Sequence, residues 1–263
     1  MKKKLLCLIL TLLLCILPVC ADELPTGAER FAGKSPEGLV EEFVREHHLS
    51  DGAFAMSYRN LVTGESFGYH ELEMMVAAST YKVPLNLYYY RMENNGEIAP
   101  DAFIPNAGMT LDKAHERSLV LSDNDVSEGM IYYLGGFKIY KQAMRDFFTL
   151  TDDEIDEQYY YGNLYCARMM TDALQWLYDR SEDYQPMLEL MKRAQPEQGY
   201  FRRDVTEIEV AHKYGSYEGA ENDVGIFFAE QPFALAVYTR DTLGEEYCAQ
   251  FARLMTDYNL YRT

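Results

Sequence analysis

The chain has 263 residues, 48% of them hydrophobic, which is enough to bury the core of one or two domains. Glycine and proline are not enriched and no repeat stands out, so disorder does not describe most of the chain. With 24 basic and 42 acidic residues the net charge is −18. Such an acidic surface repels polyphosphates, which argues against a nucleic-acid partner.

The first 21 residues have the order of a secretory signal peptide. Lysines at positions 2–4 precede an apolar run over Leu5–Leu17, and Val19-Cys20-Ala21 forms a small-residue exit. The run is short for a transmembrane helix, although an N-terminal membrane anchor is an alternative. A second alternative is a lipid anchor at Cys20, because Leu17-Pro18-Val19-Cys20 resembles a bacterial lipobox. We expect bacterial-type export, with a released, extracytoplasmic protein favoured over a lipoprotein.

Two cysteines, Cys166 and Cys248, lie beyond this leader. In an exported protein they would be able to form a disulfide, but the distance between them cannot be read from the sequence. Two separate buried thiols are an equally good expectation, because free cysteine is often buried.

The N-terminal part predicts a helix followed by a hairpin. Ser35-Pro36-Glu37 has the residue types of an N-cap and an acidic first turn, and predicts a helix over Pro36–His47. Alternation of large and small side chains over Phe54–Tyr58 predicts a strand. Turn residues at Asn60–Gly64 then lead to a returning strand over Glu65–Tyr69.

The middle of the chain predicts helices, and the C-terminal part returns to strands. Helical patterns run from Thr80 to Asp179, with loops at 94–108 and 151–163, and helices are expected over 167–178 and 185–193. The later elements that we expect are strands over Ile208–Lys213, Asp223–Ala229 and Ala234–Thr239, a turn over Gly215–Asn222, and a final helix from about Gly244.

This order predicts an α+β fold. We expect a five-stranded antiparallel sheet assembled from both ends of the chain and flanked by the N- and C-terminal helices, with an all-helical lobe inserted. The expected boundaries are a signal peptide over 1–21, a sheet lobe over 22–75 and 204–263, and a helical lobe over 76–203.

Three short motifs follow one another along the chain. Ser79-Thr80-Tyr81-Lys82 places a serine and a lysine one helical turn apart, where the amine can activate the weakly nucleophilic hydroxyl. Ser122-Asp123-Asn124 is the second motif, and His212-Lys213-Tyr214-Gly215-Ser216 is the third. Taken singly, each has an ordinary explanation as a capped helix, a polar interhelical turn or a strand-end turn.

Taken together, the motifs resemble the nucleophile apparatus of the class A β-lactamase and penicillin-binding superfamily. The similarity extends over Ala77–Leu85, Met109–Leu111 and Val210–Ile226, and it covers roughly Glu37 to the C-terminus. It implies a serine acyl-transfer protein without a cofactor or metal. The substrate would be a small molecule, either a β-lactam or a peptidoglycan peptide.

The resemblance also implies roles for four catalytic residues. Ser79 would be the acylated nucleophile, and Lys82 its base or proton relay. Ser122 would pass a proton to the departing amide nitrogen. Lys213 would supply positive charge for a substrate carboxylate.

The substrate-binding residues implied by the resemblance are Asn124, Tyr214, Gly215 and Ser216. Asn124 would hydrogen-bond an acylamide side chain, and the backbone N–H groups of Ser79 and Ser216 would form an oxyanion hole. Tyr214 departs from the family pattern, which has Thr or Ser there to hold the carboxylate. The Ser216 hydroxyl would be a substitute.

A second departure concerns deacylation. Class A β-lactamases carry a Glu-x-x-Leu-Asn motif whose glutamate activates water, and Tyr165-Cys166-Ala167-Arg168 resembles the helix that follows it. Glu154 and Glu157 precede that helix outside any such motif and are typical of a solvated acidic loop. Asn163 stands nearest to the expected asparagine. We therefore expect an acyl-enzyme that forms at Ser79 and breaks down slowly.

Three functions are consistent with these motifs. The favoured one is a β-lactamase-like serine hydrolase acting on β-lactams. The second is a penicillin-binding or peptidoglycan-peptide enzyme that releases its acyl group slowly. The third is an exported binding domain of the same fold without turnover, against which the intact catalytic motifs argue.

Overall fold

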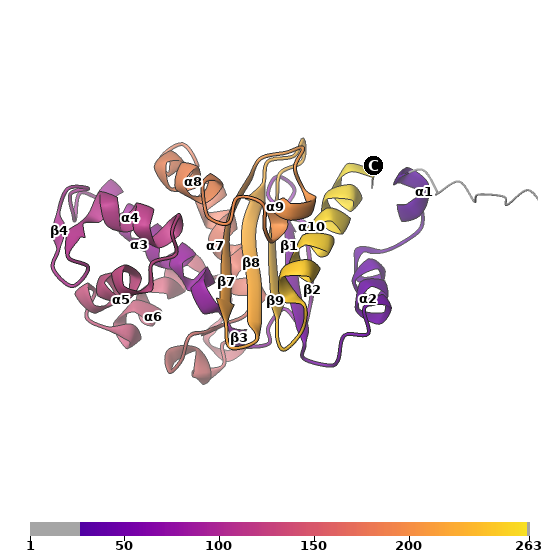
Figure 1. Ribbon diagram of the computed structural model, residues 1–263, viewed down its shortest axis with the longest axis horizontal. Helices are drawn as coiled ribbons and strands as arrows, with labels where there is room; N and C mark the ends of the chain where they lie inside the picture. Colours follow the sequence, from indigo (N-terminus) through magenta and orange to yellow (C-terminus); the bar gives the residue numbers. More distant parts are fainter. Residues whose placement is uncertain (1–26, 262–263) are drawn as a thin grey trace, which may run out of the picture.

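The centre of the fold is a five-stranded antiparallel sheet in the order β2-β1-β9-β8-β7 (Figure 1). The structure is a computed structural model that describes residues 27–261, so the predicted signal peptide and Cys20 lie outside it. The strands come from both ends of the chain, which confirms the predicted fold class. They are β1 (Phe54–Asn60), β2 (Ser66–Tyr69), β7 (Val210–Tyr217), β8 (Ala220–Phe227) and β9 (Phe233–Thr239).

One face of the sheet is covered by helices from both ends of the chain. These are α1 (Gly27–Phe31), α2 (Pro36–Glu46), α9 (Phe201–Asp204) and α10 (Gly244–Tyr261). The α2 helix starts where it was predicted, because the Ser35 side chain accepts a hydrogen bond from Gly38 N at 3.1 Å. Phe43, Phe54 and Phe251 meet at the centre of this layer, with ring centroids 5.0–5.6 Å apart.

The other face carries α7 and, beyond it, the helical lobe (Figure 1). The side chains of β9 point alternately to the two faces of the sheet, so the strand contributes to both core layers. Leu235 and Val237 belong to one core cluster, and Ala234 and Ala236 belong to the other. The helices on this side are α3 (Lys82–Asn94), α4 (Leu111–Leu119), α5 (Asn124–Tyr133), α6 (Phe137–Met144), α7 (Ala167–Tyr178) and α8 (Gln185–Lys192).

Short elements fill the predicted loops of this lobe. Two antiparallel pairs join β3 (Met75–Val76) to β6 (Leu164–Tyr165), and β4 (Phe103–Ile104) to β5 (Met109–Thr110). Short 3-10 helices also occur, at Ala78–Tyr81, Arg145–Phe147, Asp152–Glu154 and Glu157–Tyr160. Where the lobes divide along the chain remains a prediction.

The β7–β8 hairpin is longer and tighter than the sequence suggested. A turn was expected over Gly215–Asn222, but both strands continue through most of it and only Glu218 and Gly219 lie between them. These two residues have φ of 45° and 83°, as a two-residue hairpin turn requires. The polar and glycine residues that suggested a long turn are paired in the ladder instead, and Asn60 is likewise the last residue of β1.

Cys166 and Cys248 are both free and buried. They belong to core clusters on opposite faces of the sheet, so the structure favours two separate thiols over a disulfide. Burial raises the pKa of Cys166 to about 12 and that of Cys248 well above its usual value. Among the helices of residues 27–261, none is long and apolar enough to cross a membrane.

Candidate active site

Ser79 lies in a strained turn that leads into α3. The turn is the 3-10 helix Ala78–Tyr81, and Ala78 has a φ of 49°, which costs a residue with a side chain on the order of 1–3 kcal/mol. The sheet supports this turn from below, because the Thr80 and Tyr238 hydroxyls are 2.8 Å apart. Ser79 itself is half-buried, so its side chain stays accessible from solvent.

Lys82 joins the first two motifs. Its Nζ lies 3.1 Å from Ser79 Oγ, 3.2 Å from Ser122 Oγ and 2.7 Å from Asn124 Oδ1. It also donates to the Ser122 carbonyl oxygen at 2.6 Å. Four of the predicted site residues are therefore brought together by the hydrogen bonds of one amine.

The protonation of Lys82 suits a base. Its side chain is buried, and desolvation lowers the pKa to about 8 against the opposing negative charges of Asp123 and Glu128. With that pKa, about one molecule in ten carries the neutral amine at pH 7.

The turn before α5 is shaped to face Lys82. Ser122 has a φ of 58°, and Asp123 caps α5 by accepting from Val126 N at 3.1 Å. The cap fixes the start of the helix, so that Asn124 in its first turn points to the amine.

Gly215 lets β7 approach Ser79. A β-carbon at this position would lie 2.6 Å from Ser79 N and 2.8 Å from the Ala77 carbonyl oxygen, so only glycine fits. The close approach brings the backbone at Ser216 beside Ser79, and both residues line the same cleft. The oxyanion hole formed by the backbone N–H groups of Ser79 and Ser216 stays a prediction.

The other two residues of the third motif lie differently. Lys213 is fully buried, and its Nζ donates to the Tyr214 carbonyl oxygen at 2.9 Å. Desolvation and the nearby charge of Lys82 hold its pKa well below the usual value. The Tyr214 ring packs against Tyr200 in the core layer under α10, with the ring centroids 4.8 Å apart. It is therefore not among the residues that contact Lys82 and Ser79.

An open cleft of about 560 Å³ lies over Ser79. It includes predicted site residues and others that sequence reasoning did not single out. The residues that line it include Ser79, Asn124, Glu128, Asn163 and Ser216.

Asn163 holds the turn that carries Ser79 from the side of the loop before α7. Its side-chain Nδ2 donates to the Ala78 carbonyl oxygen at 2.8 Å, and its main-chain carbonyl oxygen accepts from Ala77 N at 2.9 Å. Buried Lys141 supports the next residue by donating to the Leu164 carbonyl oxygen at 2.9 Å. Lys141 has no motif around it, and the sequence gives no sign of its burial.

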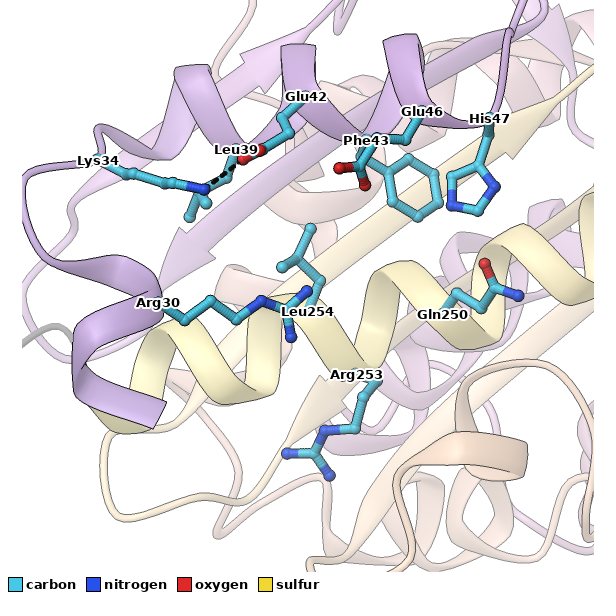
Figure 2. A pocket seen from close by; sticks show the side chains of 10 residues that line it. All are labelled: Arg30, Lys34, Leu39, Glu42, Phe43, Glu46, His47, Gln250, Arg253 and Leu254. Atoms are coloured by element: carbon cyan, nitrogen blue, oxygen red, sulfur yellow. Dashed lines mark hydrogen bonds and ion pairs between the residues drawn. The ribbon is translucent and has the colours of Figure 1, made fainter. Parts of the chain in front are cut away.

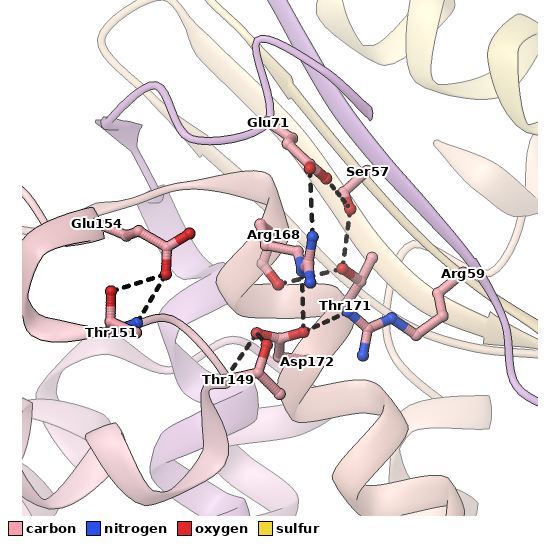
Figure 3. Close-up of polar contacts among 9 residues, drawn as sticks. All are labelled: Ser57, Arg59, Glu71, Thr149, Thr151, Glu154, Arg168, Thr171 and Asp172. Atoms are coloured by element: carbon pink, nitrogen blue, oxygen red, sulfur yellow. Dashed lines mark hydrogen bonds and ion pairs between the residues drawn. The ribbon is translucent and has the colours of Figure 1, made fainter. Parts of the chain in front are cut away.

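Glu154 has a structural role in the loop (Figure 3). Its Oε2 accepts hydrogen bonds from Thr151 N and Oγ1, both at 2.9 Å, which makes a capping box. Glu157 is exposed in the next 3-10 helix, and neither glutamate lines the cleft. Both therefore fit the expectation of a solvated acidic loop.

A buried network anchors the start of this loop, as Figure 3 shows. Asp172 accepts from Arg59 at 2.6 Å, from Arg168 at 3.2 Å and from Thr149 N at 2.8 Å. Arg168 also pairs with Glu71 at 3.3 Å. Asp172 on α7 thus ties the loop to β1 and to the segment after β2.

A second hollow of about 190 Å³ lies between α2 and α10 (Figure 2). Charges of both signs line it, and Lys34 pairs with Glu42 there at 2.5 Å. It contains none of the three motifs. Among the described residues, no group of three or more His, Cys, Asp or Glu side chains is placed to hold a metal ion.

Comparison with solved structures finds the same fold at low sequence identity. The class A β-lactamase of the last common ancestor of Gram-negative bacteria has a TM-score of 0.71 at 19% identity, covering 83% of this chain and 98% of that one. A β-lactamase from Chitinophaga pinensis DSM 2588 has a TM-score of 0.70 at 18% identity, covering 85% and 98%. No curated protein matches the sequence significantly. The model of the beta-lactamase enzyme family matches residues 40–259, and this chain belongs to that family.

Proposed function

We propose that this protein is a serine hydrolase that opens β-lactams by forming an acyl-enzyme at Ser79. The observation that carries the proposal is the hydrogen-bonded cluster of Lys82 with Ser79, Ser122 and Asn124. Nucleophilic catalysis needs a hydroxyl, an adjacent base and donors for the developing oxyanion, and each has a residue here.

Acylation proceeds by transfer of the Ser79 proton to neutral Lys82 as Ser79 Oγ attacks the lactam carbonyl carbon. The carbonyl electrons move to oxygen, where the backbone N–H groups of Ser79 and Ser216 stabilise the charge. The C–N bond then breaks, and the nitrogen takes a proton from the Ser122 hydroxyl, which regains one from Lys82. The product is an ester at Ser79 with Lys82 neutral again.

Substrate recognition is proposed to use Asn124 and the third motif. Bound substrate would displace the contact between Asn124 and Lys82. The Asn124 side-chain amide would then hydrogen-bond the acylamide group of the substrate. Buried Lys213 is proposed to gain its positive charge when a substrate carboxylate approaches, because a nearby negative charge raises the pKa of a buried amine. The exposed Ser216 hydroxyl is proposed to replace the family's Thr or Ser as the carboxylate contact. Export through residues 1–21 would let the enzyme meet such substrates outside the cytoplasm.

A peptidoglycan-peptide enzyme with slow deacylation is the second candidate. The observation that favours it is the loop before α7, whose glutamates lie away from the cleft. A chromogenic cephalosporin and intact-protein mass spectrometry together separate the candidates. Steady hydrolysis supports the hydrolase, whereas a lasting adduct without turnover supports the second candidate. A protein that shows neither an adduct nor turnover would refute both enzyme candidates. A binding domain without catalysis would then be the remaining function.

A further inference from the structure

A carboxylate reaches the cleft from the helical lobe. Glu128 lies four residues after Asn124 on α5, and side chains so spaced share one helix face with β-carbons about 5–6 Å apart. Because Asn124 Oδ1 lies 2.7 Å from Lys82 Nζ, Glu128 is one helical turn from the cluster around Ser79. Glu128 also lines the same cleft as Ser79.

Glu128 is the one acidic side chain among the described residues that line this cleft. It is exposed, so its carboxylate is accessible to a reacting molecule. Its negative charge raises the pKa of Lys82, which places it within electrostatic range of the base. Glu154, by contrast, is held by Thr151 in its capping box.

A second acceptor lies near Glu128. Asn163 lines the cleft, and together with Glu128 and Tyr81 it also lines an adjoining hollow of about 290 Å³. The bond from Asn163 Nδ2 to the Ala78 carbonyl oxygen fixes the direction of the amide. Asn163 Oδ1 is buried and accepts no hydrogen bond from residues 27–261. Buried acceptors are normally satisfied, and hydrolysis brings a water with two protons to donate.

We propose that Glu128 is the general base of deacylation and that Asn163 Oδ1 orients the attacking water as its second acceptor. This inference rests on the proposed acyl-enzyme at Ser79. Both oxygens would accept from one water, whose remaining lone pair then faces the ester carbon.

The step is balanced as ester hydrolysis. Water oxygen bonds to the ester carbon while Glu128 takes one water proton, and the carbonyl electrons move onto oxygen between the N–H groups of Ser79 and Ser216. Return of these electrons breaks the bond from carbon to Ser79 Oγ. The proton held by Glu128 passes to Ser79 Oγ, which releases the acid and restores both residues.

The test is Glu128→Gln, compared with Glu154→Gln and Glu157→Gln as matched controls elsewhere on the chain. Benzylpenicillin is mixed with each full-length protein, and mass spectrometry follows both the appearance and the decay of the adduct. Removal of a general base typically slows its step by about 10²–10⁴-fold. We expect Glu128→Gln to acylate at close to the wild-type rate and to lose its adduct at least 10²-fold more slowly. Normal acylation also shows that the variant is folded.

Three results would overturn the inference. Equal adduct lifetimes for wild type and Glu128→Gln would remove Glu128 from deacylation while leaving the acyl-enzyme proposal intact. A lengthened lifetime in Glu157→Gln alone would place the base on the loop. A wild-type protein that forms no adduct would refute the acyl-enzyme proposal itself, and the role of Glu128 with it.

Discussion

The Lys82 ammonium and the Ser122 carbonyl oxygen are 2.6 Å apart, and this hydrogen bond joins motifs 40 residues apart in the sequence. It depends on the left-handed backbone of Ser122 and on the Asp123 cap that follows. The same amine contacts Ser79, so the packing of the turn before α5 against the start of α3 holds the Lys82 side chain beside the Ser79 hydroxyl.

Lys82→Ala should slow acylation by about 10²–10⁴-fold, because the Ser79 hydroxyl loses its base. In the wild type the neutral amine is the active form, so the rate should rise with pH and level off above a pKa of about 8. Stopped-flow acylation between pH 6 and 9 measures both effects. Lys113→Ala, an exposed lysine of α4, is the control. A flat pH profile would contradict the role of Lys82.

Gly215→Ala should disable the site and also lower the stability of the fold, because the new β-carbon overlaps buried backbone atoms that must shift to make room. The new β-carbon meets Ser79 N at 2.6 Å, and a displacement of about 1 Å at a reacting group can cost 10²-fold in rate. Gly38→Ala, in exposed α2, should leave acylation unchanged. Adduct formation and thermal melting would be compared for both variants. A fully active Gly215→Ala would show that β7 does not need this close approach.

Asp172→Ala should destabilise the protein strongly. It leaves Arg59 and Arg168 without their shared buried partner, and breaking such a pair costs about 3–5 kcal/mol. Glu116→Ala breaks the exposed pair with Arg193 and should cost less than about 1 kcal/mol. Urea unfolding measures both free energies. Equal values for the two variants would mean that the Asp172 network does not anchor the loop.

Cys166 and Cys248 should remain thiols in oxidising buffer. A chain that begins after residue 21 has no other cysteine. Because both are buried with raised pKa values, an alkylating reagent should label neither in the native protein and both after unfolding without a reductant. Failure to label the unfolded chain would reveal a disulfide.

The sequence predicted the elements whose signals are local. The Ser35 cap marked the start of α2, and the three motifs carried the resemblance that gave the fold. The β7–β8 turn was predicted too long, because Gly215 and Asn222 resemble turn residues until strand pairing places them in the ladder. The resemblance placed Tyr214 among the substrate-binding residues, but alternation along β7 turns its ring to the other face of the sheet, where it packs against Tyr200.

The cleft residues outside the three motifs could be identified only once the fold was known. The spacing of Asn124 and Glu128 puts them on one helix face, but only the packing of α5 turns that face toward Ser79. Lys141 resembles an ordinary surface lysine and is buried under Tyr159 and Tyr165.

The most direct measurement is peptide mapping after exposure to benzylpenicillin, with Ser79→Ala treated in parallel. Acyl transfer predicts that one equivalent of the opened lactam is found on the peptide containing Ser79 at early times, and none on the variant. An unlabelled Ser79 after long exposure, or the same label on Ser79→Ala, would contradict it.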